Sequence, residues 1–150
     1  MAISVMIDHM AWKRSLGVNR FARLAARAAL KVAGADPSRY DLSITFTDDA
    51  TLARLNRKWR AKNRPTNVLS FPARQQSGER FLGDVILAAG VIKREAEQQG
   101  KSLSSHASHL IVHGVLHLLG HDHHEISAAR KMERMEVRAL ESLGIENPYH

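Results

Sequence analysis

Three histidines with the spacing of metal ligands lie in one short segment, HGVLHLLGHDH, at residues 113–123. Residues four apart on a helix lie one turn apart on the same side, so His113 and His117 can direct two imidazoles at one point. Gly120 supplies the positive φ that ends the helix and turns the chain back, and His123 then follows within reach of the same point. We therefore predict a metal centre with His113, His117 and His123 as ligands and an open fourth position.

The composition of the chain favours zinc as the metal. There are nine histidines and no cysteine, which excludes disulfides and thiolate ligands and leaves imidazoles and carboxylates to build a transition-metal site. Neutral imidazole nitrogens suit a borderline ion better than they suit magnesium or calcium. A zinc ion lowers the pKa of a bound water to about 7, which supplies a hydroxide nucleophile at neutral pH. The sequence therefore predicts one zinc ion per chain and hydrolytic chemistry.

Other polar side chains near these histidines could complete or support the centre. His121 and His124 flank the third expected ligand and could take its place, and Asp122 could orient a ligand or lie at the edge of the metal. His109 lies one turn before His113 on the same side of the helix and could hold a ligand or face the substrate. An isolated histidine pair on a half-buried helix is more often structural, but a third histidine after a turn glycine favours a metal site.

The spacing also matches the zincin metallopeptidases, whose pattern is H-E-x-x-H-x-x-G-x-x-H. In that pattern, the glutamate after the first histidine is the general base. Gly114 occupies this position here, and a glycine cannot take a proton from water. The segment therefore predicts a zincin-like metal helix but argues against peptide hydrolysis.

The elements that must hold this centre can be predicted from hydrophobic periodicity. Alternating or continuous apolar residues predict strands at about 3–7, 42–46, 68–71 and 81–88. Helical spacing predicts helices at about 19–33, 91–99, 105–119 and 127–143, and one more that opens after Thr47. The order βαβαββααα indicates an α+β fold, with a small mixed sheet of about four strands packed with helices, in a single domain of residues 1–150.

Charge is distributed unevenly along the chain, which has a net charge of +7. Residues 13–74 hold 14 Lys and Arg against four acids, a local net charge of +10. Such a stretch favours a surface that binds a polyanion, and its alternative is a solvated basic surface that maintains solubility. No segment approaches the roughly 18 apolar residues of a membrane span, and the N-terminus lacks the layout of a secretory signal. We therefore expect a soluble, cytoplasmic protein with no membrane partner.

Three segments together closely resemble the YbeY family of bacterial endoribonucleases, over nearly the entire chain. They are the histidine segment 113–123, the block RAKNRPTNVLSFP at 60–72, and Leu82-Gly83-Asp84. The resemblance implies a zinc-dependent ribonuclease that cleaves single-stranded RNA. It would act in ribosomal RNA processing, notably at the 3′ end of the small-subunit RNA, and in ribosome quality control, with the ribosome or its small subunit as partner. It also implies His113, His117 and His123 as zinc ligands and Arg60 as a functionally important arginine.

Two side chains outside the histidine segment have candidate roles in such a reaction. Arg60 offers a planar, permanently charged fork that suits the charge developing on a phosphodiester, and its alternative is a solvated charge at a helix end. Asp84 could hydrogen-bond a metal ligand or take a proton, and its alternative is a structural aspartate satisfied by backbone amides. The general base stays open: zinc-bound hydroxide needs none, His109 or Asp84 could serve, or the 2′-hydroxyl of the RNA could attack.

Two other classes of function compete with catalysis on RNA. The first is a non-catalytic ribosome-assembly factor, whose zinc would be structural and closed by four protein ligands. The second, a metallopeptidase-like hydrolase, is disfavoured by Gly114.

Overall fold

The computed structural model describes residues 3–7, 17–60, 66–73, 80–122 and 125–149, and for Trp59 and Arg60 it describes the backbone only. The strands are β1 (Ile3–Ile7), β2 (Asp41–Thr47), β3 (Val68–Pro72) and β4 (Phe81–Ala88). The helices are α2 (Val18–Val32), the short 3-10 helix η1 (Pro37–Arg39), α3 (Asp49–Arg60), α4 (Ala89–Gln99), α5 (Leu103–Leu118) and α6 (Ile126–Ser142). This order of elements confirms the order expected from the sequence.

The strands form one mixed sheet in the order β1-β2-β4-β3. β1 and β4 both run parallel to β2, and β3 pairs antiparallel with β4. Val5, Ile44, Val85 and Ser70 are successive partners across the sheet and therefore lie on the same face of it. The α+β fold class and the mixed sheet of four strands are thus confirmed.

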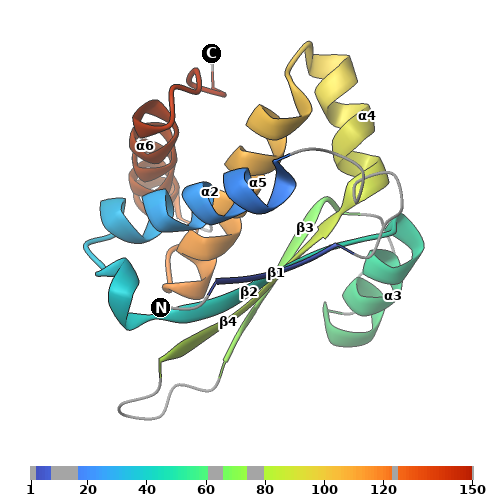
Figure 1. Cartoon of the computed structure of the whole chain (residues 1–150), viewed down its shortest axis with the longest axis horizontal. Coiled ribbons are helices and arrows are strands. Elements are labelled where there is room, and N and C mark those ends of the chain that lie inside the picture. Colours follow the sequence, from blue (N-terminus) through green and yellow to red (C-terminus); the bar gives the residue numbers. More distant parts are fainter. Residues whose placement is uncertain (1–2, 8–16, 61–65, 74–79, 123–124, 150) are drawn as a thin grey trace.

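Helices cover both faces of this sheet (Figure 1). α2, α5 and α6 enclose the main core on one face, where Ile44, Val85 and Leu87 are fully buried. A second, smaller cluster lies on the other face, where Leu52 of α3 packs with Leu69 and Ala88. α4 contacts both α3 and α5, so the helix α5 that carries the histidines is fixed between the sheet and three other helices.

Helix ends follow from the capping residues that the sequence shows. α2 is closed at Gly34, with φ 77°, and α4 ends at Gly100, with φ 65°. At the start of α3, the Asp48 carboxylate accepts a hydrogen bond from the Thr51 amide at 2.7 Å, which satisfies a free N–H of the first turn. Asp48 thus caps the helix that the sequence predicts to open after Thr47.

The basic stretch identified in the sequence is divided between the two faces of the sheet. α2 exposes Arg20, Arg23, Arg27 and Lys31 on the side of α5 and α6, whereas α3 exposes its basic residues on the opposite side (Figure 1). The basic residues that the structure describes in this stretch are therefore distributed over two surfaces instead of forming one. Among the described helices, none is both long enough and apolar enough to cross a bilayer.

Gly114 allows α5 to lie unusually close to the sheet. The Ser70 hydroxyl donates to the Gly114 carbonyl at 2.9 Å. A Cβ atom added to Gly114 would lie 2.7 Å from Cγ1 of Val85 and 3.1 Å from Oγ of Ser70. The residue that lacks the catalytic side chain of a zincin therefore has a packing role, because a larger side chain fits there only if Val85, Ser70 or the helix moves.

We expect Gly114→Ala to lower the free energy of unfolding by about 1 kcal/mol. Overpacking in a filled core costs about 1–3 kcal/mol, and the better helix propensity of alanine recovers about 1 kcal/mol of it. Urea unfolding measures this change, with Ser104→Ala on the exposed side of α5 as the matched control. A Gly114→Ala protein as stable as the wild type would show that the contact with Val85 is not close.

Candidate metal centre

Beyond Ser104, α5 is buried except for one partly exposed stripe. It comprises Ser105, His109, His113 and His117, spaced four residues apart, so all lie on one side of the helix. Ser102 begins the helix by accepting a hydrogen bond from the Ser105 amide at 3.1 Å. The sheet and the neighbouring helices bury the other sides, so the histidines are presented at the one accessible side.

Gly120 closes α5 as the sequence predicts. Its φ is 93°, and its amide donates to the His117 carbonyl at 3.0 Å. The His121 amide donates to the Leu116 carbonyl, also at 3.0 Å, which is the pairing expected when a left-handed residue ends a helix. The chain therefore turns away at Gly120, shortly after His117, and leaves that imidazole in the last turn of the helix.

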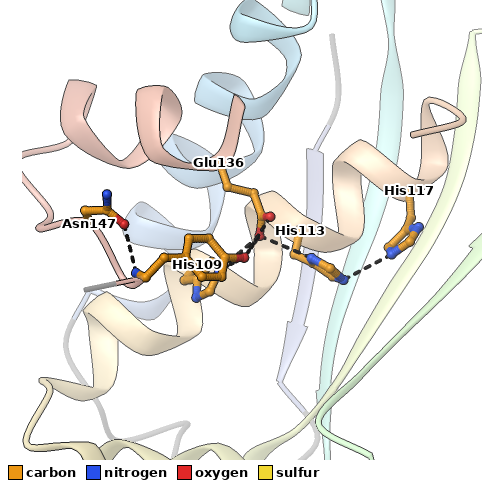
Figure 2. Close-up of polar contacts among 6 residues, drawn as sticks. His109, His113, His117, Glu136 and Asn147 are labelled. Atoms are coloured by element: carbon orange, nitrogen blue, oxygen red, sulfur yellow. Dashed lines mark hydrogen bonds and ion pairs between the residues drawn. The ribbon is translucent and has the colours of Figure 1, made fainter. Parts of the chain in front are cut away.

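The imidazoles of His113 and His117 converge. Their Nε2 atoms lie 3.0 Å apart, and the rings stand nearly perpendicular at 78° with centroids 4.6 Å apart (Figure 2). Two nitrogens bound at about 2.0–2.1 Å to one tetrahedral zinc ion lie roughly 3.3 Å apart. The two side chains therefore fit a shared metal ion, because a small opening of the pair would let both lone pairs point at one cation.

A buried carboxylate holds the other side of His113. Glu136, on α6, is 1% exposed, and its Oε1 lies 3.1 Å from His113 Nδ1 and 2.9 Å from His109 Nε2. The Tyr149 hydroxyl donates to both carboxylate oxygens, at 3.0 and 2.9 Å. Figure 2 shows Glu136 reaching from α6 toward His113, which in turn faces His117. The His113 ring is thus held through Nδ1 on the side opposite to His117.

The electrostatics of these groups agree with their hydrogen-bond roles. Burial raises the pKa of Glu136, but hydrogen bonds from His109 and His113, and then their charges, outweigh burial and bring that pKa to about 2. Burial, followed by the negative charge of Glu136, raises the pKa of the Tyr149 hydroxyl. At neutral pH, Glu136 is therefore an ionised acceptor and Tyr149 a protonated donor.

The third expected ligand, His123, lies outside the described residues, as does His124. Within the described ranges, no group of three or more His, Asp or Glu side chains is arranged to hold a metal ion. Asp122 is exposed just beyond the end of α5. The structure thus brings together two of the three expected ligands, and the place of His123 in the centre stays a prediction.

Two further candidates, His109 and Asp84, lie on different sides of the sheet. His109 is held by Glu136 and by the Tyr149 hydroxyl, the latter at 3.3 Å. Asp84 precedes Val85 in β4, and Val85 faces Gly114, so Asp84 points to the opposite face of the sheet. There it accepts a hydrogen bond from Ser43. The structure therefore links His109 to His113 through the shared Glu136 carboxylate and places Asp84 on the other face of the sheet.

Arg60 is the last residue of α3, as expected for a helix end. Its side chain lies outside the description, and so do residues 61–65 that follow it. The role of Arg60 therefore stays a prediction.

Reasoning from the sequence did not identify Glu136 or Tyr149. A signal for Glu136 was present, because it occupies a position on the apolar face of α6 together with the buried Met132, Met135, Ala139 and Leu140. A carboxylate at such a position is costly unless a partner satisfies it. The pattern alone predicts that a partner exists, whereas its identity depends on how α5 and α6 pack.

The fold and the histidine pair together define the class of this protein. It is an α+β protein that presents two imidazoles one turn apart on a mostly buried helix. Metal-dependent hydrolases use two histidines in this arrangement as the first two ligands of their metal ion.

Comparison with known proteins identifies the family. The chain belongs to the YbeY family, because the family model described as Endoribonuclease YbeY matches residues 7–144. A relative from Azorhizobium caulinodans is 43% identical and covers 99% of this chain and 96% of its own. One from Paramagnetospirillum magneticum is 45% identical over 98% of this chain and 94% of its own. Both are named Endoribonuclease YbeY.

A solved solution structure from Thermotoga maritima has a similar fold. Its TM-score is 0.57 at 16% identity, and the match covers 99% of each chain. The α+β architecture described above is therefore found in a distant solved protein.

Proposed function

We propose that this protein is a metal-dependent endoribonuclease that acts in ribosomal RNA processing. Membership of the YbeY family and the names of relatives that match nearly the whole chain support this function. The observation that carries the metal dependence is the convergence of His113 and His117, whose Nε2 atoms lie 3.0 Å apart while Glu136 holds His113 from behind.

We further propose that the metal is zinc, one ion per chain, held by His113, His117 and His123. The absence of cysteine and the neutral imidazole donors favour zinc. When bound, zinc would supply Lewis-acid chemistry, polarising a phosphoryl oxygen or acidifying a water. The partly exposed side of α5 gives a substrate access to this position, whereas a closed structural site would need a fourth protein ligand.

The chain's own residues have separate tasks in the proposed reaction. Arg60 would stabilise the negative charge that builds on the phosphodiester, because its guanidinium fork matches two phosphate oxygens. His109 would hold Glu136 instead of acting as a base, since its Nε2 faces Glu136 and its Nδ1 is buried. Asp84 faces away from the histidine pair. We therefore assign the proton transfer from the nucleophile to neither side chain.

The proposed substrate is single-stranded RNA, with ribosomal RNA and its small-subunit 3′ end as the physiological target. We also propose that the protein binds the ribosome or its small subunit in the cytoplasm and takes part in ribosome quality control. The basic surfaces of α2 and α3 support an RNA partner, because lysine and arginine gain affinity for phosphates by releasing counterions.

The direct test of this function is cleavage of an end-labelled single-stranded RNA by the purified protein. We expect internal cuts in the RNA, weaker cutting of the same RNA in a duplex, and no cutting of the matching DNA. RNA binding without cleavage would favour a non-catalytic assembly factor. Cleavage of a peptide library but not of RNA would favour a peptidase.

RNA binding should weaken steeply as salt rises, by at least about tenfold between about 50 and about 200 mM, since several phosphate contacts contribute to the slope. Paired variants show which surface is used. We expect Arg54→Gln with Arg57→Gln, on the helix that ends in Arg60, to reduce the slope more than Arg27→Gln with Lys31→Gln on α2. An affinity independent of salt would contradict binding through phosphates.

A further inference from the structure

We propose that Glu136 is a positioning residue that fixes the tautomer of His113 and thereby sets the metal affinity of the centre. The proposal rests on the proposed function and adds to it a carboxylate that lies 23 residues from His113 along the chain. Glu136 does not itself face the point where the two Nε2 atoms converge, so it acts through His113.

The hydrogen bond determines which nitrogen of His113 carries the proton. An ionised carboxylate can only accept, so His113 Nδ1, 3.1 Å from Glu136 Oε1, must donate. The neutral ring then carries no proton on Nε2, whose lone pair is directed toward His117, 3.0 Å away. A histidine that binds a metal through Nε2 requires this tautomer. Glu136 thus prepares His113 to be a ligand before any metal arrives.

Because the Glu136 carboxylate is buried, its negative charge depends on the few partners that surround it. The carboxylate is 1% exposed, and its ion pairs in the described part of the chain are with His109 and His113 only. A buried carboxylate without a lysine or arginine partner is costly unless hydrogen bonds and a nearby cation compensate it. His109 and His113 provide this compensation, and a metal ion bound to the far nitrogen of His113 would add to it through the imidazole.

His109 and Tyr149 complete the environment of the carboxylate. Their rings pack edge to face at 5.5 Å, and both donate to Glu136. The Tyr149 amide also donates to the Asn147 side chain at 2.8 Å. The Glu136 carboxylate therefore accepts hydrogen bonds from His109, His113 and Tyr149, which together hold its position.

The test compares Glu136→Gln, Glu136→Met and the control Glu141→Gln, which alters an exposed carboxylate on the same helix. Zinc affinity is measured by competition with a chromophoric chelator, and the stability of each metal-free protein by urea unfolding. We expect Glu136→Gln, which keeps an acceptor but no charge, to lose about 10- to 100-fold in zinc affinity. Glu136→Met should lose at least as much, and Glu141→Gln should bind zinc as the wild type does.

A second readout reports the tautomer directly. Long-range ¹H–¹⁵N spectra of the metal-free wild type should show His113 protonated on Nδ1, and Glu136→Met should shift this ring toward the Nε2–H tautomer. A wild-type His113 protonated on Nε2 would overturn the proposal. So would a Glu136→Gln protein that binds zinc as tightly as the wild type, whatever its stability. Absence of zinc binding in the folded wild type would instead refute the proposed metal centre itself, and zinc binding without RNA cleavage would refute only the proposed function.

Discussion

Replacing His117 with alanine is expected to remove the bound metal and to lower RNA cleavage by about 10³-fold or more. Loss of an outer partner of a metal ligand already costs about 10- to 100-fold, and loss of a direct ligand should cost more. The fold should persist, because His117 is partly exposed at the end of α5 and its truncation leaves no core cavity. Metal content, urea unfolding and single-turnover cleavage, measured on the same preparation, check the three parts of this result.

His121→Ala is the matched control for this variant. His121 is also partly exposed, lies four residues further along, and contributes its amide to the helix end, which alanine preserves. We expect His121→Ala to keep its metal. If it loses the metal while His117→Ala keeps it, the ligands have been assigned wrongly and the convergence of His113 and His117 is only a hydrogen bond.

Arg60→Ala is expected to lower cleavage by about 10²-fold, or about 2.7 kcal/mol, while zinc content and fold are retained. The arginine lies at the end of α3, outside the histidine segment, so its truncation removes no metal ligand. Its proposed contact forms with charge that accumulates only in the transition state, and such contacts affect turnover more than affinity. RNA binding should fall only slightly, because one arginine is a small share of the basic residues.

The control for Arg60→Ala is Arg134→Ala, which removes an exposed arginine of α6. Single-turnover cleavage and RNA affinity are measured for both. Equal cleavage by Arg60→Ala and Arg134→Ala would mean that Arg60 is a solvated charge at a helix end, the alternative that the sequence also allowed.

Much of the fold could be predicted from local patterns. The apolar alternation of β1 and the glycines that end α2, α4 and α5 depend on neighbours within a few residues, and all are where the sequence indicates. The strand order could not be predicted, because it depends on pairing between distant segments. β4 lies between β2 and β3, although β3 precedes it in the chain.

The candidate site shows the same division between local and distant interactions. The convergence of His113 and His117 follows from helical geometry and was predictable. The contact of Glu136 with His113 depends on the packing of α5 against α6, which no local sequence pattern shows. Asp84 was considered for the site because it interrupts an apolar run, but strand alternation places it opposite Val85 and away from α5.

The measurement that tests the central claim most directly is metal-free protein titrated with zinc while RNA cleavage is followed. Chelation should leave the protein folded and inactive. Cleavage of single-stranded RNA should then return in proportion to added zinc and saturate at one ion per chain. Cleavage that is undiminished in the folded, metal-free protein, or that does not return with zinc or any other transition metal, would contradict a metal-dependent endoribonuclease built on His113 and His117.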